Sequence, residues 1–66
     1  MKLKITYDTS KDKFYFDYDD GTLETFYGLY VACERLCELL HNEFTMAESI
    51  LDQVQNSDFG ITIEIK

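Results

Sequence analysis

The sequence lacks proline and tryptophan and has only two cysteines. Two cysteines cannot build the disulfide framework of a small secreted domain. A structural zinc site usually needs four Cys or His ligands, and the chain has only Cys33, Cys37 and His41. The chain also has no apolar run near the roughly 20 residues that cross a bilayer, and its first residues alternate in polarity, unlike a signal peptide. We therefore expect a cytoplasmic protein with no membrane segment, metal or other cofactor.

Positive charge is scarce as well. Six Lys and Arg residues stand against 13 Asp and Glu residues, which gives a net charge of −7. Direct binding to nucleic acid is disfavoured, because such binding draws on positive charge. Between residues 14 and 65 the chain has 11 acidic residues and one basic residue, Arg35. Such a segment is either an ordinary solvated surface or a face that docks on a basic surface.

What the chain does have is enough apolar material for one core. Its 66 residues are 45% hydrophobic and include five Tyr and five Phe. A chain of this length forms one domain and not two. We expect a single compact domain over residues 1–66.

Three segments near the N-terminus have the pattern of strands. Residues 2–7 and 13–19 alternate apolar and polar side chains, and a polar turn over residues 8–12 separates them. Asp20-Gly21 is typical of a two-residue type I′ hairpin turn. That turn predicts a third strand over residues 22–26, with Tyr18 opposite Leu23 on the core face, Asp17 opposite Glu24, and Tyr15 opposite Phe26. The alternative is one long helix starting at Leu23, which would place Gly28 and several β-branched or aromatic residues inside it.

Two helices and a last strand follow. The first helix is expected from Gly28 to about Asn42, with an apolar stripe of Leu29, Ala32, Cys33, Leu36, Cys37 and Leu40. Thr45 to Glu48 has the pattern of a capping box for a second helix to about Gln55. Its inward residues are expected to be Met46, Ala47, Ile50, Leu51 and Val54. A final strand is predicted where Phe59, Ile61, Ile63 and Ile65 alternate with small or polar residues.

This order, β-β-β-α-α-β, predicts a two-layer α+β fold. Its four-stranded antiparallel sheet carries both helices on one face, and the last strand lies beside the first.

No residue pattern indicates an enzyme. Cys33 and His41 are eight positions apart on the first helix, about 12 Å along its axis, which is too far to share one metal ion. The acidic pairs lie in a hairpin turn without an apolar pocket to separate their pKa values. The three glycines are scattered and form no phosphate-binding loop.

Two groups of residues are candidates for binding a partner. The second hairpin has a dense group of carboxylates, and the first helix has two more one turn apart. Aromatic residues predicted to be exposed lie near them, as in interfaces with an aromatic centre and a polar rim. The candidate partner-binding residues are Asp17, Asp19, Asp20, Glu24, Glu34, Glu38, Tyr15, Phe26 and Tyr30.

In size, acidic charge and compact α+β pattern, the whole chain resembles the small phage-encoded inhibitor proteins, including anti-CRISPR proteins and other DNA mimics. No motif carries this resemblance, so it assigns no residue a role. It implies a protein that occupies the nucleic-acid site of a host complex, with carboxylates in place of phosphates, in the host cytoplasm.

These observations predict a non-enzymatic module, a monomer or homodimer, that binds a basic protein or nucleoprotein complex. The alternative is a structural or assembly protein that self-associates through the aromatic sheet face.

Overall fold

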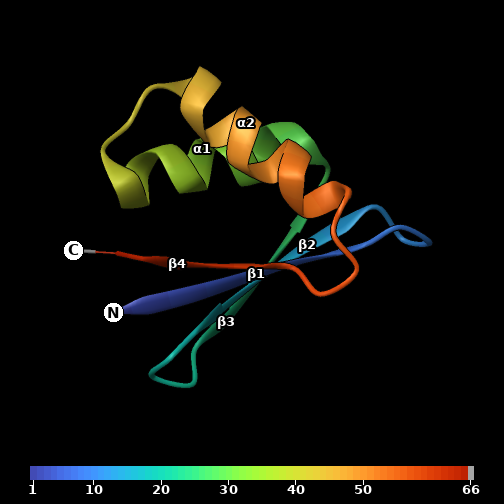
Figure 1. The fold of residues 1–66 in the computed structure, drawn as a ribbon, viewed down its shortest axis with the longest axis horizontal. Helices are drawn as coiled ribbons and strands as arrows, with labels where there is room; N and C mark the ends of the chain where they lie inside the picture. Colours follow the sequence, from blue (N-terminus) through green and yellow to red (C-terminus); the bar gives the residue numbers. More distant parts are fainter. Residues whose placement is uncertain (66) are drawn as a thin grey trace.

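A computed structural model describes residues 1–65 and contains the predicted elements in the predicted order. The elements are β1 (Lys2–Asp8), β2 (Lys13–Tyr18), β3 (Leu23–Tyr27), α1 (Leu29–Leu40), α2 (Phe44–Gln55) and β4 (Ile61–Glu64). Figure 1 shows the sheet with both helices on one side of it. The extended conformation of residues 23–27 excludes the alternative of a long helix starting at Leu23.

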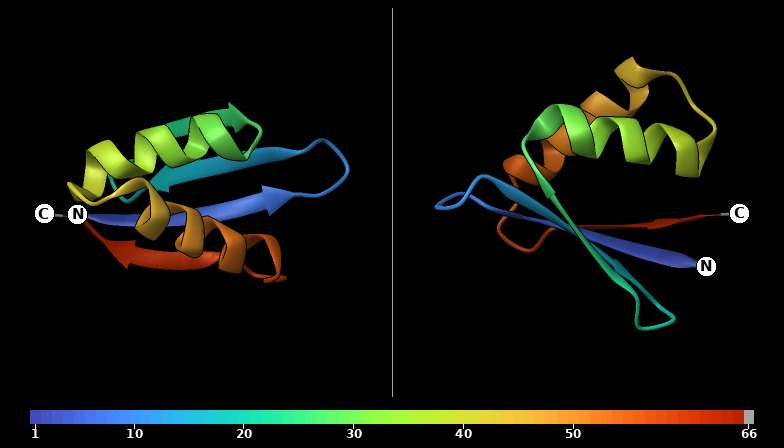
Figure 2. Two further views of the ribbon diagram at one scale, coloured as in Figure 1. Left: turned by 90° about the horizontal axis from the view of Figure 1, so that it is seen from above. Right: turned by 180° about the vertical axis from the view of Figure 1, so that it is seen from behind.

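The four strands form one antiparallel sheet in the order β3-β2-β1-β4, so the last strand lies beside the first, as predicted. Viewed from above, α1 lies over the β3 and β2 side of the sheet and α2 over the β1 and β4 side (Figure 2). The face of the sheet turned away from the helices is not covered by any element among residues 1–65. We call it the open face.

The register of the second hairpin differs from the prediction by one residue. Asp17, and not Tyr18, lies opposite Leu23, and Phe14 lies opposite Phe26. The turn contains three residues, Asp19 to Gly21. Tyr18 N–H donates to Thr22 O at 2.9 Å, and Gly21 N–H donates to Tyr18 O at 3.0 Å. A type I′ turn needs positive φ at both central residues. Here Gly21 has a φ of 93° and Asp20 does not have a positive φ.

Both helices form, but their ends differ from the prediction. The first ends at Leu40, two residues earlier than expected, because His41 adopts a left-handed conformation with φ 55° and ψ 37°. The second begins at Phe44 with Glu43 as its N-cap and without a side-chain cap hydrogen bond. The predicted capping box is therefore wrong, since Thr45 lies inside the helix and not at its cap.

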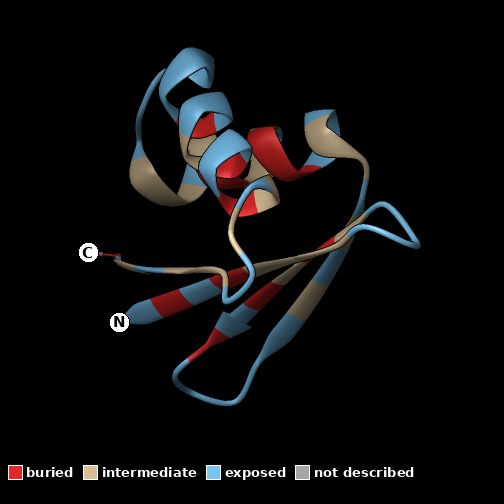
Figure 3. Cartoon of the chain, turned by 45° about the vertical axis from the view of Figure 1, so that its right-hand side comes forward, coloured by how far each residue is buried: buried red, intermediate tan, exposed pale blue. Residues whose placement is uncertain are grey.

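The core lies between the sheet and the helices, and Figure 3 shows buried residues alternating with exposed or intermediate ones along β2 and the first half of β1. A fully buried Phe or Leu side chain contributes about 1.5–3 kcal/mol. The buried apolar side chains are Leu3, Ile5, Phe14, Phe16, Tyr18, Ala32, Cys33, Leu36, Ala47, Leu51, Val54 and Ile65. Most of the predicted inward positions are thus confirmed. Three are wrong: Met46 is 54% exposed, Phe59 lies before β4 and is 86% exposed, and Leu23 lies on the open face and is 59% exposed.

Among the described residues, neither helix is long and apolar enough to span a membrane.

Candidate interaction surfaces

The carboxylates predicted to cluster at the second hairpin are divided between the two faces of the sheet. Asp17 lies on the open face, where its neighbour on β1 is Lys4. Glu24 lies on the helix side, opposite Phe16. Because one residue of register exchanges the two faces of a strand, the three-residue turn moves Glu24 away from Asp17. The predicted opposition of these two like charges does not occur.

Glu24 is engaged by two side chains. Its Oε1 accepts a hydrogen bond from the Tyr18 hydroxyl and another from Arg35 Nε at 3.2 Å. Arg35 also donates from Nη1 to Glu38 Oε2 at 3.2 Å. Burial is the largest cause, and the hydrogen bond to Glu24 the second, that raises the pKa of Tyr18 to about 12. Glu24 thus joins the sheet edge to α1 and is already paired with the one arginine of the chain.

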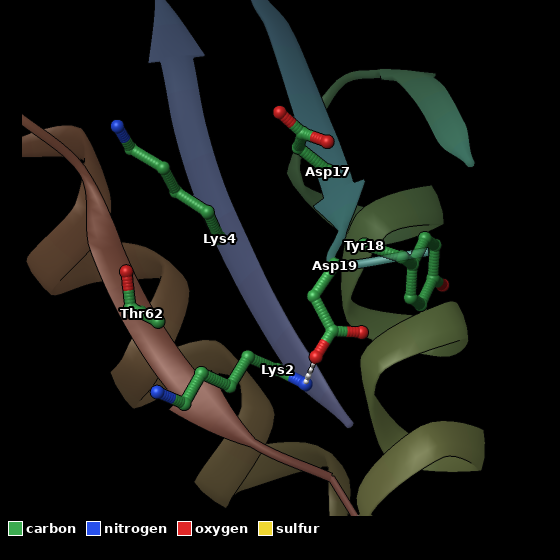
Figure 4. A pocket seen from close by; sticks show the side chains of 6 residues that line it. All are labelled: Lys2, Lys4, Asp17, Tyr18, Asp19 and Thr62. Carbon is green, nitrogen blue, oxygen red and sulfur yellow. Dashed lines mark hydrogen bonds between the residues drawn. The ribbon is translucent and has the colours of Figure 1, made fainter. Parts of the chain in front are cut away.

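The turn carboxylates Asp19 and Asp20 stabilise the local backbone. Asp19 Oδ2 accepts a hydrogen bond from the backbone N–H of Lys2 at 3.0 Å (Figure 4). Asp20 Oδ1 accepts one from the N–H of Thr22 at 2.9 Å, and this bond holds the pKa of Asp20 below its usual value. Both residues remain exposed.

The open face carries charges of both signs. A shallow hollow there is lined by Lys2, Lys4, Asp17, Tyr18, Asp19 and Thr62 (Figure 4). At the other end of β2, Lys13 Nζ lies 4.8 Å from the centroid of the exposed Tyr27 ring. This mixture gives the open face little net charge, and we do not assign the acidic docking surface to it.

The predicted pairing of Tyr15 with Phe26 on the open face is wrong for the same reason of register. Tyr15 lies on the open face opposite Thr25 and is half-buried. Phe26 points to the helix side, where its ring packs edge-on against Phe16 at 4.8 Å between centroids. Tyr27 takes the exposed aromatic position instead, and it is 67% exposed.

The outer surface of the two helices is more uniformly acidic. Residues 29–55 contain five carboxylates and one arginine, for a net charge of −4 with His41 neutral. All five carboxylates are exposed: Glu34, Glu38, Glu43, Glu48 and Asp52. We call this the helix surface. The predicted residues Glu34 and Glu38 lie on it, together with three carboxylates that we did not single out from the sequence.

An aromatic pair accompanies these carboxylates. Tyr30 of α1 is 66% exposed, and its ring lies 5.4 Å from that of Phe44 at the start of α2. Each ring has a carboxylate four residues later on its own helix, Glu34 after Tyr30 and Glu48 after Phe44, which places ring and carboxylate on one helix face. Sequence reasoning missed Phe44, because it placed this residue in the connection before the second helix.

The residues capable of binding soft metals differ in exposure. Cys33 is buried, Cys37 is half-buried and His41 is exposed at the end of α1. Burial is the main cause that raises the pKa of the Cys33 thiol to about 11, so this sulfur is a protonated core group. No group of three His, Cys, Asp or Glu residues in the described part of the chain is placed to hold a metal ion.

Comparison with known proteins found no family model that matches the chain, no similar curated protein and no similar solved structure.

Proposed function

We propose that the protein is a non-enzymatic binding module that docks its helix surface on a basic surface of a nucleic-acid-binding partner and thereby inhibits it. The observation that carries this proposal is the segregation of charge. The helix surface has a net charge of −4, whereas the described lysines lie on the strands and turns of the first hairpin. Proteins that meet through opposite charges gain association rate and specificity from such an arrangement.

Arg35 is the one cation of the helix surface, and it does not cancel the negative charge that a partner would meet. Arg35 bonds Glu24 on the sheet and Glu38 on its own helix. Four other exposed carboxylates of the helix surface make no ion pair among residues 1–65, namely Glu34, Glu43, Glu48 and Asp52. A row of carboxylates on a helix pair can occupy a groove that otherwise accepts phosphates, which is the mode that the resemblance to phage inhibitors implies.

The Tyr30–Phe44 pair supports a protein partner. Interfaces are enriched in aromatic residues at the centre with polar residues around them. A basic partner supplies guanidinium groups that bind carboxylates and stack on aromatic faces. The pair thus gives a docked partner an apolar contact in addition to ionic ones.

The proposal is tested by neutralising the helix surface. After a partner is captured from a host lysate and identified, the variant Glu34→Gln, Glu38→Gln, Glu48→Gln, Asp52→Asn should bind it at least about 10-fold more weakly, chiefly through a slower on-rate. Wild-type affinity should also fall as salt is raised.

A control neutralises two carboxylates elsewhere. Asp17→Asn with Glu64→Gln changes charge on the open face and should leave partner binding within about two-fold of wild type, since neither side chain lies on the helix surface. Salt-insensitive binding, or equal loss in both variants, would show that the helix surface is not the docking face.

A further inference from the structure

The outer edge of β3 is unoccupied by any strand among residues 1–65, because β3 ends the sheet and pairs only with β2. Such an edge presents a row of backbone N–H and C=O groups that can pair with another chain. Proteins often protect these edges with proline, lysine, a bulge or an inward-pointing charge. The strand Leu23–Tyr27, with the sequence LETFY, contains neither proline nor lysine, and its one inward-pointing charge, Glu24, is already bonded to Tyr18 and Arg35.

The hydrogen-bond pattern determines which residues face outward. Tyr18 N–H donates to Thr22 O at 2.9 Å, and Gly28 N–H donates to Asp12 O at 3.1 Å. Since bonded pairs alternate along an antiparallel ladder, residues 22, 24 and 26 direct their backbone groups to β2. Leu23, Thr25 and Tyr27 therefore direct theirs to the free edge. Their side chains lie on the open face, where Leu23 is 59% and Tyr27 67% exposed.

We propose that this edge pairs with β3 of a second copy, antiparallel and centred on Thr25, to form a two-fold dimer with a continuous eight-stranded sheet. In this register Leu23 lies opposite Tyr27 of the second copy, and the two Thr25 residues lie opposite each other. All three outward-facing residues take part, giving about six backbone hydrogen bonds, because each such pair exchanges two.

The side chains of β3 favour a second copy as the occupant. The two-fold register places an exposed aliphatic side chain beside an exposed aromatic one, at both ends of the pairing; such cross-strand pairs stabilise sheets. The one acidic residue of β3 is Glu24. It faces Phe26 of the second copy and not the other Glu24, and it is already bonded to Tyr18 and Arg35. No carboxylate of β3 therefore meets its equivalent directly across the new pair.

The other edge of the sheet is a poorer template. Ile65 N–H donates to Met1 O at 2.7 Å, and Met1 N donates to Ile65 O at 3.1 Å. By the same alternation, Ile61 and Ile63 face β1, which leaves Thr62 and Glu64 as the described outward residues of β4. A two-fold pairing there forms about four hydrogen bonds and brings a carboxylate to each end of the pair.

The dimer is independent of the proposed function and responds to salt in the opposite sense. A two-fold axis between antiparallel strands of one sheet is perpendicular to that sheet, so both helix surfaces lie on the same side. Each copy carries a net charge of −7, and salt screens their repulsion. Salt should therefore strengthen the dimer, whereas it should weaken docking on a basic partner.

The first test measures mass in solution by light scattering from micromolar to millimolar concentration. The mass of the wild-type protein should approach twice the monomer mass as concentration rises. In high salt this increase should occur at lower protein concentration. Thr25→Pro removes an outward-facing N–H without removing a bond to β2, and it should remain monomeric. Thr25→Val, which keeps the N–H, is the matched control and should dimerise like wild type.

The second test identifies the contact itself. Within one copy, Leu23 and Tyr27 are four residues apart in an extended strand, about 13 Å. A nuclear Overhauser effect between the Leu23 methyls and the Tyr27 ring, in a mixture of isotope-labelled and unlabelled protein, therefore arises only between copies. Leu23→Lys should abolish this contact and the dimer, whereas Phe59→Lys, with the same charge change at an exposed site outside the sheet, should preserve both.

A wild-type protein that stays monomeric at millimolar concentration in high salt overturns the proposal. A dimer that lacks the Leu23–Tyr27 contact, or that survives Leu23→Lys, overturns it as well. Should Thr25→Pro fail to fold, the comparison of Leu23→Lys with Phe59→Lys decides the matter.

Discussion

Glu24 shows how the position of one carboxylate determines whether it is available to a partner. It lies on an edge strand but points to the helix side, where it accepts hydrogen bonds from Tyr18 and Arg35. An inward-pointing charge at a sheet edge needs such partners, since an unpaired one is costly to desolvate. The acidic group at residues 17–24 therefore does not act as one surface, although its members are close in sequence.

We expect the Glu24–Arg35 pair to contribute measurably to stability. Its two side chains are 31% and 36% exposed, so solvent screens part of the attraction. A double-mutant cycle with Glu24→Ala and Arg35→Ala, measured by urea unfolding, should give a coupling energy of about 0.5–1 kcal/mol.

The exposed pair Arg35–Glu38 is the control for this cycle. Glu38 is 70% exposed, and the corresponding cycle with Glu38→Ala should give about 0.3 kcal/mol. Equal coupling energies in the two cycles would show that Glu24 does not anchor α1 to the sheet.

At the scale of elements, the sequence predicted every strand and helix but missed one register. Alternation over residues 2–7 and 13–19 indicates strands reliably, because one face of each strand is buried. Asp20-Gly21 also marked the turn correctly. The dipeptide does not determine whether Asp19 belongs to the strand or to the turn. A shift of one residue at this point moves every side chain of β3 to the opposite face of the sheet. Phe26 and Glu24 consequently moved to the helix side.

The helix ends were less predictable for a related reason. Thr45 and Glu48 have the spacing of a capping box, yet the helix starts one residue before Thr45, where Phe44 packs against Tyr30. The helix therefore lacks the capping hydrogen bond expected of Thr45, which contributes about 1 kcal/mol where it forms. The contact between Tyr30 and Phe44 depends on how the two helices cross, and a local sequence pattern does not predict that crossing.

The entry to β4 depends on Gly60, and we expect this position to tolerate no side chain. Its φ is 76°, and an added Cβ would press against the backbone oxygen of Ile5 and lie 2.7 Å from Thr6 Cγ2. Gly28 also has a positive φ, 93°, but an added Cβ there meets nothing within 4 Å. Both alanine substitutions incur about 1–3 kcal/mol of backbone strain.

Gly60→Ala should therefore destabilise the protein by about 1–3 kcal/mol more than Gly28→Ala, since only Gly60 adds steric overlap. Urea unfolding of both variants measures this difference. Equal losses would indicate that β1 shifts freely to make room beside Gly60.

For the whole molecule, charge is distributed unevenly between the layers. The helices and their connection have a net charge of −4, whereas the open face combines lysines with carboxylates. Ion pairs in the described part of the chain involve the N-terminal ammonium group and Arg35, and none involves a lysine. The few attractive ion pairs therefore offset only a small part of the mutual repulsion among the exposed carboxylates.

Salt should consequently stabilise the fold. Raising sodium chloride from low to near-molar concentration screens repulsion among exposed carboxylates more than it weakens the few pairs. We expect the thermal midpoint to rise by about 4–8 °C, which corresponds to about 1 kcal/mol for a domain of this size. Circular dichroism at low micromolar concentration measures the midpoint while limiting dimer formation. The variant Glu34→Gln, Glu38→Gln, Glu48→Gln, Asp52→Asn should start from a higher midpoint and respond less to salt, because the helix surface is then close to neutral. A wild-type midpoint that falls with salt would mean that attraction outweighs repulsion, and that the acidic helix surface carries no electrostatic cost for a basic partner to relieve.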